Sequence, residues 1–252
     1  MTRARNRLAL LLALPLAFTL SLGLGACGKK DDAASVADAA PLAAVAPPAG
    51  KAWADVVTQT PEGGYLMGNP NAPLKLIEYG SLTCPHCAEF SEKGLPTLRD
   101  TYVASGRVSL EFRNFVRDKY DTTMAMLTRC SSPDAFYGLT EQVYANQKDI
   151  FAGLEALGKD PSIATLSEDK LFPVIGARGG LVDFFAARGV AKDQALQCLA
   201  NTKTATTLAE GVQKATDQYQ ITGTPSFILN GRNLDVATWE QLEPILKRAG
   251  AR

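Results

Sequence analysis

The sequence predicts an α/β protein in which helices surround a central sheet and a large helical insertion interrupts it. Three short segments carry strand signals, at 74–79, 107–115 and 225–229. The long segment between the last two, about 121–218, carries none and contains several helical runs. The insertion is therefore expected to divide the strands of a small α/β unit.

The first 26 residues have the layout of an export signal. Three arginines and no acidic residue precede an apolar run from Leu8 to Leu24, which ends in small residues. A transmembrane helix retained in the mature protein is the alternative. The run is at the short limit for spanning a bilayer, and Pro15 interrupts it. The pattern therefore predicts a cleaved signal peptide, residues 1–26.

The end of this run resembles the lipobox of bacterial lipoproteins. Leu24-Gly25-Ala26-Cys27 places a cysteine where that class is cleaved and acylated. The resemblance implies cleavage before Cys27 and attachment to a bacterial membrane through lipid on Cys27. We therefore expect a periplasmic, lipid-anchored protein, with soluble secretion as the alternative.

The charge balance excludes one class of partner. The sequence has 26 basic and 26 acidic residues; the signal carries three of the basic ones and no acidic one, so the mature chain has a net charge of −3. This balance gives no electrostatic basis for binding nucleic acid. Export also places the remaining cysteines in an oxidising compartment, where disulfides persist.

Residues 27–60 are rich in alanine and proline and show no strand or helix period. This composition predicts a disordered tether that holds a domain off the membrane. It is too short, and its composition too simple, to form a dimerisation domain, so we expect a monomer. From Pro61 the composition becomes globular, and residues 61–252 have a length typical of one domain with an insertion.

Within this domain each expected element has a local signal. The strand at 74–79 is short and apolar apart from two charges, the strand at 107–115 alternates with period 2, and Asn230-Gly231 predicts a hairpin turn. The expected order is strand 74–79, helix from Pro85 to about Ser105, strand 107–115, helical block 121–218, strand 225–229, hairpin strand at Asn233, and a final helix from Thr238 to about Lys247.

The chemistry is expected at Cys84-Pro85-His86-Cys87, where the first strand gives way to a helix. Unpaired N–H groups and the helix dipole at a helix N-terminus favour an anion, so Cys84 is expected to have a lowered pKa and to act as nucleophile. His86 is the only histidine in the chain and can add a donor or a positive charge. A stabilised thiolate makes the corresponding disulfide a strong oxidant.

Other uses of a Cys-x-x-Cys pair fit the sequence less well. Zinc ribbons use two such pairs, and covalent haem requires a histidine directly after the second cysteine, where this chain has Ala88. We therefore expect no metal and no cofactor. A purely structural local disulfide remains the alternative.

The segment from Glu78 to Cys87 and the run Phe112-Arg113-Asn114-Phe115 resemble the DsbA-like thioredoxin family of periplasmic disulfide oxidoreductases. Gly223-Thr224-Pro225 stands where thioredoxin folds place a cis-proline that faces the dithiol. The resemblance covers about residues 62–250. It implies a thioredoxin fold with a large helical insertion.

The resemblance also implies roles for single residues. Cys84 exchanges disulfides with the substrate, Cys87 resolves the mixed disulfide, and His86 stabilises the Cys84 thiolate. Glu78 is similar to the family's buried acid, which helps to move the proton of Cys87. The alternative for Glu78 is an edge-strand charge that faces water.

Thr224 and Pro225 are expected to present backbone groups to an extended substrate segment. The implied function is an oxidase that donates the Cys84–Cys87 disulfide to cysteine-containing exported proteins and is reoxidised by a membrane partner. One alternative is a reductase or isomerase on the same scaffold, which Thr224 leaves open. A second is a non-catalytic, chaperone-like binding lipoprotein.

Two cysteines remain, Cys130 and Cys198, both in the helical block. If Cys84 pairs with Cys87, only the 130–198 pairing is left. In an oxidising compartment a structural disulfide is expected. The alternative is two buried free thiols that act as small hydrophobic side chains.

Overall fold

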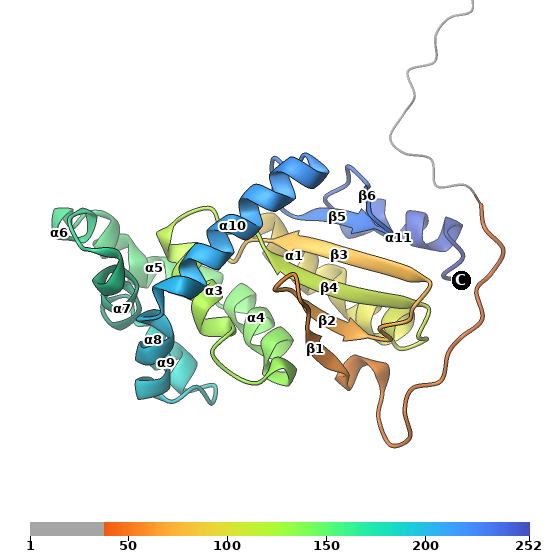
Figure 1. Cartoon of the computed structure of the whole chain (residues 1–252), viewed down its shortest axis with the longest axis horizontal. Helices are drawn as coiled ribbons and strands as arrows, with labels where there is room; N and C mark the ends of the chain where they lie inside the picture. The colour runs from red at the N-terminus through yellow and green to blue at the C-terminus, as the bar shows by residue number, and fades with distance from the viewer. Residues whose placement is uncertain (1–37) are drawn as a thin grey trace, which may run out of the picture. The chain divides into compact units, whose positions relative to one another are not determined.

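The computed structural model describes residues 38–252, so the predicted export signal and Cys27 lie outside the described residues. The described part contains a six-stranded sheet with the order β1-β2-β4-β3-β5-β6 (Figure 1). β3 and β4 are parallel, and every other neighbouring pair is antiparallel. The strands are β1 Val57–Gln59, β2 Tyr65–Gly68, β3 Leu74–Gly80, β4 Val108–Asn114, β5 Ser226–Leu229 and β6 Arg232–Asn233.

The helices fall into four groups along the chain, of which the first is a 3-10 turn, Trp53–Asp55, before β1. Between β3 and β4 are α1 Pro85–Lys93, α2 Leu95–Thr97 and a π-helix, Leu98–Val103. The insertion between β4 and β5 contains α3 Lys119–Thr128, a 3-10 turn Pro133–Ala135, α4 Phe136–Ala145, α5 Gln147–Gly158, α6 Pro161–Ala164, α7 Glu168–Arg178, α8 Leu181–Ala186, α9 Lys192–Leu199 and α10 Thr202–Tyr219. α11, Trp239–Arg248, follows the hairpin.

These elements confirm the predicted fold class. β3, β4 and β5 lie where the strand signals predicted them, and the helical insertion runs from Lys119 to Tyr219. Asn230 and Gly231, both with positive φ (48° and 83°), connect β5 to β6 as the hairpin turn requires. Helix α11 begins at Trp239 without a capping bond from the Thr238 side chain.

Strands β1 and β2 were not predicted from the sequence. β2 has only four residues, and its pairing partner β4 begins 40 residues later in the chain. β1 has three residues and pairs with β2 alone among the described strands. Such short strands are defined by pairing with distant segments rather than by a local pattern.

The predicted disordered tether is wrong for residues 38–60. The backbone N–H of Leu42 donates to the Gly250 carbonyl, and that of Val45 donates to the Ser105 carbonyl. The buried Trp53 donates its indole N–H to the Val45 carbonyl oxygen at 2.7 Å. The extended segment thus satisfies its backbone groups against the domain, which needs no apolar period. Residues 27–37 lie outside the described range.

The two faces of the sheet are distinguished by neighbouring residues of β3. Glu78 lies opposite Phe112 and Phe227, whereas Tyr79 lies opposite Arg113 and Ser226. Because successive side chains of a strand point to opposite faces, these are two different surfaces.

Each face is covered by its own helices. Phe90 of α1 packs on Phe227 with ring centroids 4.7 Å apart, so α1 covers the face that carries Glu78. On the other face, Tyr79 and Ile228 form a small apolar cluster with Ala215 of α10. Figure 1 shows α10 crossing the sheet on this side. Glu78, the acid predicted to assist the dithiol, therefore lies on the sheet face that is covered by α1, the helix that carries the dithiol.

Candidate active site

Cys84 lies at the junction between β3 and α1 and is the N-cap residue of α1. Its backbone is extended (φ −88°, ψ 122°), and Pro85 occupies the first helical position. Proline fixes the helical φ and has no N–H group. The first free amides of the helix are therefore those of His86 and Cys87.

The surroundings of Cys84 favour its thiolate. Hydrogen bonding from Cys87 is the largest cause that lowers the Cys84 pKa to about 5, and the backbone N–H groups of Cys87 and His86 add to it. Burial of the sulfur opposes this shift. In its protonated form Cys84 donates a hydrogen bond to the Thr224 carbonyl oxygen at 3.2 Å.

His86 contributes through its backbone N–H rather than through a described contact of its ring. The side chain is 73% exposed, and its Nδ1 lies 3.8 Å from a carboxylate oxygen of Glu89. The ring thus lies at the exposed rim of the site.

Cys87 and Glu78 form the buried side of the site. Cys87 is fully buried, and burial raises the pKa of its thiol well above the usual value. Glu78 is 3% exposed; burial, and secondly the charge of Cys84, raise its pKa to about 8. The structure therefore contradicts the alternative of an edge-strand charge facing water. The Glu78 carboxyl is predominantly neutral at pH 7 and holds a transferable proton.

The loop before β5 completes the site. The Thr224–Pro225 peptide bond is cis, and the Thr224 carbonyl is the acceptor for the Cys84 thiol. Residues 140 positions apart in the chain thus meet across the dithiol.

The loop from Ser81 to Cys84 is held by the insertion, mainly through Asp121 of α3. Asp121 accepts hydrogen bonds from the Ser81 hydroxyl at 2.6 Å and from the Leu82 backbone N–H at 2.8 Å. It also accepts one from the Arg117 backbone N–H at 3.0 Å. Asp121 is fully buried, and burial raises its pKa to about 6 against the effect of these donors. These bonds fix the loop that delivers Cys84 to the helix.

Two further side chains secure the same loop. Arg117 donates to the hydroxyl groups of Ser81 and Thr83, each at 3.0 Å. Gln147, the first residue of α5, donates to the carbonyl oxygens of Leu82 (2.9 Å) and Cys84 (3.2 Å). These supports were not predicted. An acid in the first turn of a helix, such as Asp121, is common, so its sequence gave no sign of a structural role.

Cys130 and Cys198 form a disulfide between the ends of α3 and α9, with a Cα–Cα distance of 5.9 Å. The predicted pairing is therefore present in the structure. Cys130 is buried in the main apolar core, and Cys198 packs against that core. The pair lies outside the neighbourhood of the dithiol described above.

Residues 38–252 contain neither a candidate metal cluster nor a membrane-spanning helix. No group of three or more His, Cys, Asp and Glu side chains in this range is placed to hold a metal ion. None of the helices in this range combines the length and apolar character needed to cross a bilayer.

The fold and the dithiol geometry match a known family. A family model described as thioredoxin matches residues 60–248. This chain belongs to the thioredoxin family. The matched range begins next to β1 and ends with α11, so it includes the dithiol, the insertion and the cis-proline.

Related thioredoxin-family proteins and structures agree with the fold. The crystal structure of a protein-disulfide isomerase from Novosphingobium aromaticivorans has a TM-score of 0.67 and 34% identity, covering 73% of this chain and 95% of that one. Wolbachia pipientis alpha-DsbA1 has a TM-score of 0.58 and 22% identity, covering 76% and 94%, and at that identity supports the fold alone.

A curated relative from Rickettsia bellii bears the name of a protein-disulfide oxidoreductase. It is 26% identical over 170 residues, which are 68% of this chain and 58% of the relative. The chain thus spans less than two thirds of the length of that relative.

Proposed function

We propose that this protein is a thiol-disulfide oxidoreductase that acts as an oxidase and donates the Cys84–Cys87 disulfide to exported proteins. The lowered pKa of Cys84, about 5, carries the proposal. A thiolate that is favoured in the folded protein stabilises the reduced dithiol, which makes the disulfide a better electron acceptor. The raised pKa of Cys87 supports a division of labour in which only Cys84 reacts with substrate.

The first step is attack on the enzyme disulfide. A substrate thiolate attacks Sγ of Cys84, a substrate–Cys84 disulfide forms, and the electron pair of the broken bond passes to Cys87. A buried thiolate at Cys87 is unfavourable because its pKa is raised. Glu78, neutral below its pKa of about 8, gives its proton to the Cys87 sulfur.

The second step releases the oxidised substrate. A second substrate thiolate attacks the substrate sulfur of the mixed disulfide, and Cys84 leaves as a thiolate. A leaving thiol with a low pKa departs faster. The substrate has lost two electrons and the enzyme dithiol has gained them, and a membrane redox partner would remove them. Thr224 and Pro225, next to Cys84, would position the extended substrate by backbone hydrogen bonds.

The reduction potential of Cys84–Cys87 tests this direction. The full chain is equilibrated with glutathione buffers, trapped with an alkylating agent and weighed by mass spectrometry. A potential near −120 mV, at the oxidising end of the range for such proteins, supports an oxidase. A potential near −270 mV sinks the proposal, because the protein would then be a reductant. A Cys130→Ser/Cys198→Ser variant, measured in parallel, assigns the transition to the dithiol.

Isomerisation is the second candidate, and one observation favours it. The Novosphingobium aromaticivorans protein, 34% identical over 95% of its chain, is named a protein-disulfide isomerase. Refolding of a scrambled, fully oxidised substrate in the presence of reduced enzyme separates the two functions. Recovery faster than the oxidation of a reduced substrate would favour isomerisation.

We also propose export to the periplasm and lipid attachment at Cys27. The support is the signal-like run and the lipobox-like Leu24-Gly25-Ala26-Cys27. Mass spectrometry of the N-terminal peptide from the cell envelope tests this. Intact residues before Cys27, or an unmodified Cys27 in a soluble fraction, would contradict it.

A further inference from the structure

A cavity of about 320 Å³ lies on the face of the sheet that carries Tyr79, opposite the face of Glu78. Its walls come from the turn before β2, the ends of β3, β4 and α3, and one side of α10. The lining side chains that matter here are Tyr79, Arg113, Asn114, Arg129 and Lys214. Neither cysteine of the dithiol lines it.

Arg129 is a largely buried cation in this wall. Its guanidinium donates to Asn114 Oδ1 at 3.0 Å and to the Gly63 carbonyl at 2.6 Å, and it lies 5.0 Å from the centroid of the Tyr65 ring. These acceptors are neutral. Among residues 38–252, no carboxylate lies within ion-pair distance of Arg129. Burial lowers the Arg129 pKa, consistent with a charge that has no partner.

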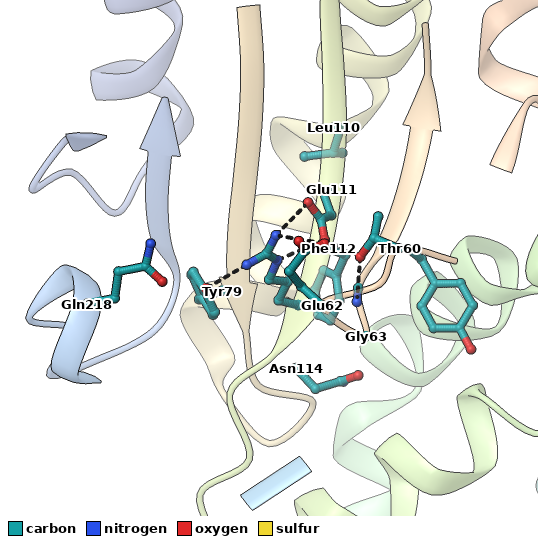
Figure 2. Close-up of polar contacts among 12 residues, drawn as sticks. Thr60, Glu62, Gly63, Tyr79, Leu110, Glu111, Phe112, Asn114 and Gln218 are labelled. Atoms are coloured by element: carbon teal, nitrogen blue, oxygen red, sulfur yellow. Dashed lines mark hydrogen bonds and ion pairs between the residues drawn. The ribbon is translucent and has the colours of Figure 1, made fainter. Parts of the chain in front are cut away.

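Arg113 lines the same cavity but, unlike Arg129, is paired with a carboxylate. It binds both carboxylate oxygens of Glu111, at 2.8 and 2.9 Å, and donates to the Tyr79 hydroxyl at 3.2 Å (Figure 2). Its charge is therefore neutralised within the protein. The Tyr79 hydroxyl accepts this bond, so its own hydrogen is available to a ligand.

The remaining polar groups of the cavity add donors and positive charge. Asn114 is 7% exposed, and its Nδ2 has no hydrogen-bond acceptor among the described residues. Lys214 is exposed on α10 and forms no ion pair with a described residue. Of the lining residues three are cations, and Glu62 is the single carboxylate. A cation held away from water is stabilised by an opposite charge, so the excess of positive charge in this cavity favours an anion.

We propose that this cavity binds a small oxyanion, such as a carboxylate or phosphate group, between Arg129 and Lys214. Tyr79 donates its hydroxyl hydrogen to the same anion. Arg113 shapes the wall, because Glu111 already neutralises it. The site is separate from the dithiol and does not rest on the proposed oxidase function, since adjacent β3 residues face opposite sides of the sheet.

Calorimetric titration of the full chain tests the site, with inorganic phosphate and acetate as separate probes at ionic strength held constant by chloride. Lys214→Gln is the main variant because Lys214 is exposed and its loss leaves the core intact. Lys170→Gln is the matched control, since Lys170 is exposed on α7 and lines neither this cavity nor the adjoining pocket that shares Arg129. Arg129→Gln and Tyr79→Phe complete the set, and circular dichroism checks their folding.

We expect saturable binding of at least one probe, weakened about 3- to 5-fold by Lys214→Gln and less than 2-fold by Lys170→Gln. Arg129→Gln should abolish it; if that variant does not fold, Lys214→Gln and Tyr79→Phe decide. Phosphate without acetate binding assigns a phosphate site, and the converse a carboxylate site. The proposal is overturned if neither probe binds at concentrations from 20-fold that of the protein up to about 20 mM. It is also overturned if both lysine variants weaken binding equally.

Discussion

The protein contains two cysteine pairs whose surroundings differ in almost every respect. Cys84 and Cys87 are three positions apart at the start of a helix, and both thiols are free in the structure. Cys130 and Cys198 are 68 positions apart and are joined by a disulfide between two helices. The first pair has backbone N–H groups on one sulfur and a buried acid near the other. The second belongs to the apolar core.

The difference shows what turns a cysteine pair into a reaction centre. A reversible disulfide needs one sulfur with a lowered pKa and a proton source for the other, and both are found only at Cys84–Cys87 within the described residues. A structural disulfide stabilises more when it closes a long loop, because it restricts the unfolded chain. Local electrostatics thus suit Cys84–Cys87 to disulfide exchange, and the long separation in the chain suits Cys130–Cys198 to stabilising the fold.

The largest expected effect is from Cys84→Ser. Oxidation of a reduced, two-cysteine peptide should fall by about 10³-fold or more, because the remaining thiol of the pair, Cys87, is fully buried and its pKa is raised. A peptide-oxidation assay monitored by alkylation measures this. Cys87→Ser is the matched control: it keeps the Cys84 nucleophile and, given a peptide that already contains a disulfide, should accumulate the Cys84–peptide mixed disulfide while the second peptide sulfur leaves as a thiolate. Retained cellular function in Cys84→Ser would instead favour a non-catalytic, chaperone-like binding role.

Removing the second pair should affect stability and leave the chemistry intact. Cys130→Ser/Cys198→Ser is expected to lower the free energy of unfolding by about 4 kcal/mol, from the loop that the disulfide closes. Denaturant titration checks the loss, with the dithiol reduced in both proteins so that it does not contribute. A variant that keeps its stability but loses peptide oxidation would contradict a purely structural role for the Cys130–Cys198 disulfide.

Glu78→Gln should have a smaller effect and should change the pH dependence. Glutamine cannot give a proton to Cys87, so turnover at pH 7 is expected to fall by about 10- to 100-fold. The wild-type rate should decline as pH rises through about 8, where Glu78 loses its proton, and approach that of the variant. A pH–rate profile of both proteins, with Glu210→Gln on exposed α10 as control, measures this.

The same substitution sharpens the comparison through stability. The Glu78 pKa is raised on folding, so the folded state binds the extra proton, and its stability falls as pH rises from the unfolded pKa through about 8. Glu78→Gln should remove this fall and make the protein more stable than wild type at pH 8 and above. Urea midpoints at pH 4 and pH 8.5 test the sign. Unchanged pH dependence would mean that Glu78 is not the buried acid described here.

Much of the fold could be predicted because the strands in its centre have strong local patterns. β3 is short and apolar, β4 alternates, and β5 ends in a turn that only a few residue types form. β1 and β2 escaped prediction because their four or fewer residues are defined by partners elsewhere in the chain. The predicted disordered tether is wrong for residues 38–60 for the same reason: composition alone cannot show that an extended chain bonds to a distant surface.

The candidate site divides in the same way. The dithiol, Glu78 and Thr224–Pro225 lie in segments whose resemblance to the DsbA-like family identified them. Asp121 and Gln147 hold the loop before Cys84 from helices that begin 35 or more residues later. Their importance comes from tertiary contacts, which the hydrophobic periodicity of a sequence does not reveal.

The docking of the N-terminal segment limits where the dithiol can work. The backbone N–H of Ala39 bonds to the Arg248 carbonyl, so the chain is fixed to the domain from this point onward. If Cys27 carries a lipid as proposed, the stretch from Cys27 to Asp38 reaches about 40 Å at full extension. A tether running to residue 60 would reach roughly three times as far. The dithiol would then stay close to the membrane surface, where a membrane-embedded electron acceptor could reach it. Substrates far from the membrane would have to diffuse to it.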